Sequence, residues 1–113
     1  MMALALTGCA TVPRSPPPEI GAPWFYDKYV SARGIPILSS AGVSDEALLA
    51  ARDMATGMTA HRPDLAHWLA TNGWRIAIIA EEEALLDLPE NAHWEKPTAD
   101  DPRLTRCERK HYD

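Results

Sequence analysis

The chain has 113 residues and a formal net charge of −5, with 46% hydrophobic and 24% charged residues. This length holds one domain at most, and the proportions are those of a globular protein. They exclude a multi-domain enzyme, a polytopic membrane protein and a low-complexity chain. Proteins that track nucleic-acid phosphates present a basic face, so the acidic balance predicts no nucleic-acid partner.

The N-terminus resembles a bacterial lipoprotein signal. Residues 1–8 carry no charged side chain, and Leu6-Thr7-Gly8-Cys9 resembles a lipobox, in which a peptidase cuts before the Cys and its thiolate accepts a lipid. This pattern predicts a signal peptide over residues 1–8 and lipid attachment at Cys9; the alternative is a chance Cys in an apolar leader. The apolar run is short and no Lys or Arg precedes it, so we expect the start codon to lie upstream.

The next segment, residues 9–23, is rich in Pro and predicts a tether without regular structure. Proline fixes φ and keeps such a segment stiff and extended. No later stretch approaches the roughly 18 apolar residues of a membrane span. We therefore expect the protein to be held in the cell envelope, on the periplasmic or extracellular face of a bacterial membrane, by its lipid alone.

Residues 24–113 are expected to form one small domain. The aromatic patch Trp24–Val30 predicts a short helix or turn that docks onto the core. Residues 34–40 predict a short strand, in which Pro36 fits only an edge position or the first residues, because proline cannot donate to a ladder.

Two helices are predicted next. Ser44 is a good N-cap, and an apolar stripe follows it up to a helix end near His61, because Pro63 disfavours a helical residue before it. Pro63 suits the first position of a second helix, which Asn72-Gly73 would end. The expected buried faces are Leu48, Ala51, Ala55 and Met58, widened by Leu49 and Met54, and then Leu65, Trp68 and Leu69.

Residues 74–80 form the clearest predicted strand, apolar enough to be central in a sheet. Its order with the strand at 34–40 and the two helices suggests parallel neighbours joined by a right-handed crossover. The fold class is therefore α/β, or α+β, with a small partial sheet and two or more helices. Beyond this strand, residues 85–89 predict a turn that re-enters the core.

Three acidic residues, Glu81, Glu82 and Glu83, leave that strand. Strand ends in open α/β sheets often face a ligand crevice, so one of them is a candidate catalytic carboxylate. The alternative, which we favour, is a solvated charge run that caps the strand. Ser39-Ser40 has no base at a readable spacing, and we assign no catalytic residue.

Metal ligands are few and badly spaced. The chain has no His-Glu-x-x-His motif, which would set two imidazoles on one helical face. Cys107 and His111 are four residues apart and suit one helical face, but a zinc site needs three or four ligands. We expect no metal or other cofactor in this chain. Cys107 and His111 are weak metal candidates, and Cys107, unpaired once Cys9 is lipidated, is a disulfide candidate.

A series of short stretches resembles one protein family in order along the chain. The stretches are Phe25-Tyr26-Asp27-Lys28-Tyr29-Val30, Gly34-Ile35-Pro36-Ile37, Val43–Leu48, Met58, His61–Leu65, Arg75–Glu81, Asp87–Glu90 and Cys107–Asp113. They resemble the front part of secreted bacterial and fungal proteins with a zincin-like metallopeptidase domain. That domain is distantly similar to the catalytic domain of anthrax toxin lethal factor.

The resemblance implies that residues 24–113 are an incomplete zincin-like domain. In that family the zinc-binding His-Glu-x-x-His helix lies well downstream, so zinc is implied for a full-length relative and not for this chain. We therefore expect an exported, lipid-anchored front portion of a metallopeptidase-like protein, inactive by itself. The alternative is a small noncatalytic envelope lipoprotein that acts as a binding or structural module. In either case the expected partner is a membrane, through the lipid, and the sequence identifies no protein or peptide partner.

Overall fold

The structure, a computed structural model, describes residues 12–110. These residues belong to two compact units that divide after Glu83. The first unit holds a three-stranded mixed sheet and two helices, and the second holds short helical turns and a third helix. The predicted small α/β fold is confirmed. The predicted signal peptide, Cys9 and His111 lie outside the described residues.

A β-hairpin opens the first unit. Strands β1 (Lys28–Ala32) and β2 (Ile35–Ser39) pair antiparallel around Arg33 and Gly34. Both turn residues have positive φ, 50° and 88°, as a type I′ turn requires. The prediction of a helix or turn through Val30 was therefore wrong from Lys28 onward. The aromatic composition hid the alternation that buries Val30 and Ala32.

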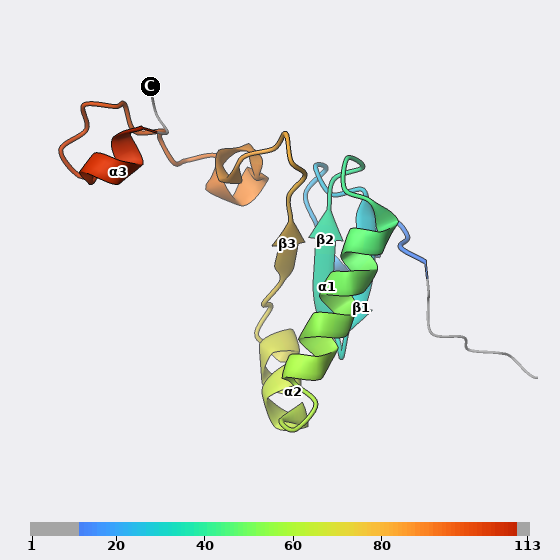
Figure 1. Cartoon of the computed structure of the whole chain (residues 1–113). Coiled ribbons are helices and arrows are strands. Elements are labelled where there is room, and N and C mark those ends of the chain that lie inside the picture. The colour runs from blue at the N-terminus through green and yellow to red at the C-terminus, as the bar shows by residue number, and fades with distance from the viewer. Residues whose placement is uncertain (1–11, 111–113) are drawn as a thin grey trace, which may run out of the picture. The chain divides into compact units, whose positions relative to one another are not determined.

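Strand β2 lies in the middle of the sheet. Strand β3 (Ile76–Ile78) pairs parallel with it, with Ile37 opposite Ile76. The predicted parallel pairing is confirmed, but the prediction that residues 74–80 form a central strand was wrong, since β3 is short and lies at the edge (Figure 1). Pro36 is the second residue of β2, and β3 joins only from Ile37, so its missing N–H does not interrupt the parallel ladder.

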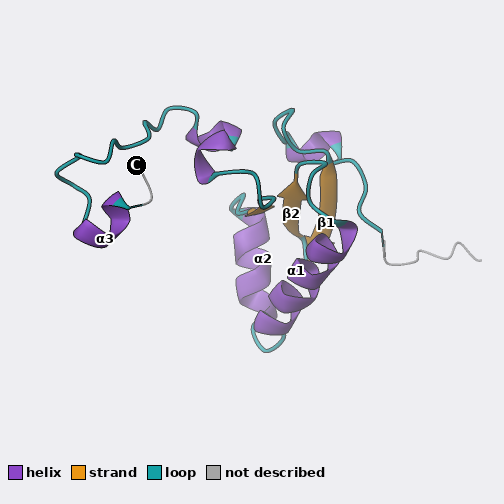
Figure 2. Cartoon of the chain, turned by 45° about the horizontal axis from the view of Figure 1, so that its top comes forward, coloured by secondary structure: helices purple, strands orange, loops and turns teal. Residues whose placement is uncertain are grey.

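Helices α1 (Asp45–Met58) and α2 (Pro63–Thr71) connect β2 to β3, joined by a short turn (Figure 2). The predicted caps are confirmed: Ser44 accepts a hydrogen bond from the Ala47 N–H at 3.2 Å, and Pro63 begins α2. The helix α1 ends at Met58, three residues before the expected end at His61.

The buried helix faces are narrower than predicted. Helix α1 buries Leu48 and Ala55 and leaves two methionines outside, whereas α2 buries Ala66. The predicted face members that are exposed are Met54, Met58, Leu65 and Trp68. On α2 the residues nearest the sheet are alanines: Ala66 is buried, and a Cβ on Gly34 of the hairpin turn would lie 3.4 Å from the Ala70 Cβ.

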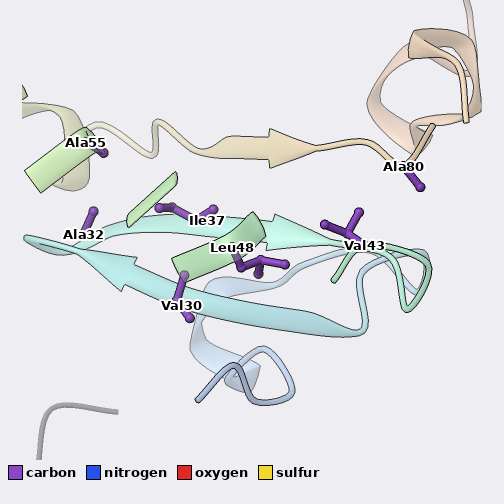
Figure 3. Close-up of a cluster of buried hydrophobic side chains, with 7 residues drawn as sticks. All are labelled: Val30, Ala32, Ile37, Val43, Leu48, Ala55 and Ala80. Carbon is purple, nitrogen blue, oxygen red and sulfur yellow. The ribbon is translucent and has the colours of Figure 1, made fainter. Parts of the chain in front are cut away.

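The core lies between α1 and the sheet. Leu48 of α1 lies between Val30 of β1 and Ile37 of β2 (Figure 3). Ile76 and Ile78 of β3 pack against this cluster but remain half-buried. Core burial is therefore complete at β2 and falls off toward β3.

The turn of the hairpin gives a stability prediction. We expect Gly34→Ala to lower the free energy of unfolding by about 1 kcal/mol, because an L-residue with φ near +88° is strained. Gly57→Ala, in α1, should raise it by about 0.5 kcal/mol, since a Cβ there meets nothing within 4 Å and alanine favours a helix. Urea unfolding of both variants checks this pair, and a loss of stability in Gly57→Ala as large as in Gly34→Ala would contradict it.

Candidate functional site

The carboxyl ends of β2 and β3 meet at one edge of the sheet, because the two strands are parallel. Ligands of open α/β sheets bind outside this kind of edge. The chain turns at residues 40–43 after β2 and at residues 80–83 after β3. This edge therefore brings together polar side chains from distant parts of the sequence.

Glu83 joins the two turns. Its Oε1 accepts a hydrogen bond from the Ala80 N–H at 2.7 Å and from the Ser40 hydroxyl at 3.0 Å. The Ser40 Oγ in turn accepts from the Gly42 N–H at 3.2 Å. Hydrogen bonds to an ionised carboxylate are stronger than those between neutral groups, so Glu83 is the principal link between the exits of β2 and β3.

The two turns approach each other closely at Gly42. A Cβ on Gly42 would lie 3.2 Å from the Glu82 Oε1 and 3.6 Å from the Ala80 Cβ. Glycine therefore leaves room for the acidic turn after β3. Ala80 itself is buried and belongs to the hydrophobic core.

The three residues of the predicted acidic run therefore do not share one role. Glu83 is half-buried and bonded to two groups, whereas Glu81 and Glu82 are exposed. Sequence reasoning missed the pairing of Ser40 with Glu83, which are 43 residues apart. The available signal was that each residue follows one of two strands predicted to be parallel neighbours.

The chemistry open to this cluster is limited. A serine nucleophile needs a base to take its proton and donors to stabilise the developing oxyanion. Here the Gly42 N–H donates to the Ser40 oxygen, and the Glu83 oxygen near Ser40 already accepts from Ala80. The two turns themselves contain no histidine. The contacts fit a link between two turns better than a catalytic dyad.

A second polar contact fixes the start of α1. The Lys28 Nζ donates to the Val43 carbonyl at 2.7 Å and to the Asp45 Oδ1 at 2.8 Å. Lys28 begins β1 and Asp45 begins α1, so this side chain ties the edge strand to the helix above it. An ion pair this exposed adds little stability by itself. Its main effect is to fix the start of α1 relative to β1.

The second unit holds Cys107, the disulfide and metal candidate. Helix α3 (Arg106–Arg109) begins after Thr105, whose Oγ1 accepts from the Glu108 N–H at 3.3 Å. Cys107 is exposed on this helix with a free thiol. Its candidate partner His111 lies outside the described residues. Within residues 12–110, no group of three or more His, Cys, Asp or Glu side chains is placed to hold a metal ion.

The remainder of the second unit is built from turns. The 3₁₀ turns Leu85–Asp87 and Pro89–Asn91 confirm the predicted turn, while its return to the core stays a prediction. Leu88 is buried, Leu86 is half-buried and Leu85 is exposed. A recess of about 850 Å³ is lined by apolar side chains that include Leu85, Trp94 and Leu104. Nearby, hydrogen bonds from the Arg103 guanidinium lower the pKa of Asp101 to about 2.

Comparison with known proteins does not add a function. No family model, no curated protein and no solved structure matches this chain. Over the residues that the structure describes, no helix has the length and apolar character needed to cross a membrane.

The Glu83 link gives a second prediction. Glu83→Ala should lower the free energy of unfolding by about 2 kcal/mol, because it leaves the buried N–H of Ala80 without its charged acceptor. Glu81→Ala removes the same charge from an exposed residue and should change stability by less than about 0.5 kcal/mol. Chemical unfolding of the two variants side by side measures the difference, and equal effects would show that Glu83 does not join the turns.

Proposed function

We propose that this chain is an exported, lipid-anchored protein in which residues 24–113 derive from the front portion of a zincin-like metallopeptidase domain. The observation that carries the proposal is Leu6-Thr7-Gly8-Cys9 followed by a Pro-rich segment. The ordered resemblance of residues 24–113 to that family supports the metallopeptidase relationship. A small α/β unit with a hairpin, two helices and a parallel strand is compatible with it.

We also propose that this chain does not hydrolyse peptides by itself. A zinc peptidase uses the metal to polarise the carbonyl and activate water, with a glutamate as base. The sequence has no His-Glu-x-x-His motif, and its described residues contain no suitable ligand set. The residues present do not fit a zinc ion, so the zinc implied for a full-length relative has no site among residues 12–110.

A second candidate function is a noncatalytic envelope lipoprotein that binds a partner. The observation that favours it is the number of large apolar side chains left on the surface of the first unit. Trp24 is 87% exposed, Met58 84% and Trp68 53%. Aromatic and methionine side chains of this kind are enriched in protein interfaces.

The intact mass of the product tests the proposal. The gene should be expressed in a bacterial host from its own locus, with the flanking DNA retained. We expect a membrane-bound product that begins at Cys9 and carries a diacylglycerol. Cys9→Ser should abolish the lipid and release the protein from the membrane fraction, whereas the matched control Cys107→Ser should keep both.

The C-terminal mass separates the two candidates. A product that continues past Asp113 into a His-Glu-x-x-His segment would support the metallopeptidase relationship, and one that ends at Asp113 would favour the binding module. An unmodified product with residues 1–8 still attached would contradict export and lipidation in both cases.

A further inference from the structure

We propose that the start of β1, together with Arg14 and Trp24 beside it, lies against the surface of the lipid bilayer to which Cys9 is attached. This inference deepens the proposed function and rests on it, because it assumes a lipid at Cys9. It assigns one face of the first unit to the membrane and places the Trp24 ring among the lipid headgroups.

The backbone is held to the outer edge of β1 from Arg14 onward. The Arg14 N–H donates to the Tyr29 carbonyl at 3.1 Å, and the Arg14 carbonyl accepts from the Tyr29 N–H at 2.7 Å. Further along the segment, the Arg75 guanidinium donates to the Ile20 carbonyl. Most of the Pro-rich segment is therefore part of the first unit and does not act as a free tether.

Little chain is left between the lipid and the folded unit. Cys9 precedes Arg14 by five residues, so their Cα atoms are at most about 18 Å apart. A free tether over residues 9–23 would reach up to about 50 Å, and the unit could then turn any face to the membrane. A small domain is about 30 Å across, so a unit held at Arg14 keeps the outer edge of β1 near the lipid headgroups.

Trp24 lies close to this attachment point. The Tyr26 N–H donates to the Pro23 carbonyl at 3.1 Å, so Trp24 and Phe25 are the central residues of a turn shortly before β1. Trp24 is 87% exposed, the largest fraction among the large apolar side chains of residues 12–110. Tryptophan is enriched at membrane–water interfaces, because its ring is apolar and its N–H can donate to a polar group.

Charge favours the same orientation. Arg14 is the single charged residue between Cys9 and Pro18, and it is exposed. Its guanidinium lies 5.6 Å from the centre of the Tyr29 ring. A guanidinium over a ring can still donate from its plane to a lipid phosphate. The chain as a whole carries a charge of −5, so anionic lipids repel it overall but attract Arg14.

Quenching of tryptophan fluorescence by brominated lipids tests the contact. The chain from Cys9 to Asp113, which contains every residue that the structure describes, is coupled through the Cys9 thiol to a maleimide phospholipid. Cys107→Ser leaves Cys9 as the only thiol. The vesicles are made of phosphatidylcholine brominated near the headgroup, with or without phosphatidylglycerol. Because the maleimide supplies the attachment, the result does not depend on whether the cell modifies Cys9, which the intact mass decides.

Two proteins with a single tryptophan are compared. One keeps Trp24, and the matched control keeps Trp68, with phenylalanine at the other three tryptophan positions in each. Trp68 is also exposed, but it belongs to α2, which lies beside the hairpin turn at the far end of β1 (Figure 1). We expect the brominated lipids to quench Trp24 at least about three times as strongly as Trp68.

A charge reversal tests the part played by Arg14. Arg14→Glu keeps the backbone hydrogen bonds to Tyr29 and should reduce the quenching of Trp24 by about half in vesicles with phosphatidylglycerol. Arg62→Glu makes the same change at an exposed residue between α1 and α2 and should leave the quenching unchanged. Equal quenching of Trp24 and Trp68, or quenching of neither, would overturn the proposal. Equal effects of the two charge reversals would overturn the role of Arg14.

Discussion

The burial of β2 on both of its faces is the constraint on which the rest of the first unit depends. Ile37, Leu38 and Ser39 are consecutive and at most 1% exposed. Successive side chains of a strand point to opposite faces, so both faces must be covered there. Helix α1 covers one face through Leu48 (Figure 3). Within the sheet, the hairpin places β1 beside one edge of β2, and the connection through α1 and α2 brings β3 to its other edge.

The packing around β2 is weaker on its β3 side than on its β1 side. The β1 side is reinforced by Lys28, which reaches Asp45 at the start of α1, and by a bridge between Arg14 and Tyr29. The prediction that residues 9–23 lack regular structure was therefore wrong at Arg14 and at the 3₁₀ turn Pro18–Ile20. The β3 side has a three-residue strand with half-buried isoleucines. Its firmest attachment beyond the ladder is Glu83, whose carboxylate holds the turn after β3 to the turn after β2. Of the three acidic residues that suggest a catalytic site in the sequence, Glu83 is thus a structural link, whereas Glu81 and Glu82 are exposed.

The sequence predicted the elements that local chemistry determines. The N-cap at Ser44, Pro63 at the first position of α2 and the end of α2 at Asn72-Gly73 were all expected and are found. The parallel strand pair was also expected, from the order of the elements along the chain. What failed depended on tertiary packing. The sequence did not show that Ala66 rather than Leu65 and Trp68 is buried, because the face that α2 turns to the sheet depends on contacts with residues far away in the sequence, such as Gly34 beside Ala70. The strand β1 was missed because its aromatic flank hid the alternation that buries Val30 and Ala32.

The candidate site was predicted only in part. The position of Glu81–Glu83 at a strand end is evident from the sequence, but the partner of Glu83 is not, since Ser40 lies 43 residues away. Lipidation at Cys9 rests on the sequence pattern, and the zincin relationship rests on the ordered resemblance. Both are proposals from the sequence, and the packing of the first unit does not depend on either of them.

Residue-level amide hydrogen exchange on the full chain tests most directly whether β2 organises the fold. Protection reports the free energy of local opening. We expect Ile37, Leu38 and Ser39 to exchange most slowly, because β2 is paired on both sides and buried. The amides of residues 85–91, in short 3₁₀ turns, should exchange at least about a hundredfold faster. Equal protection in the two segments would contradict the claim that β2 organises the fold.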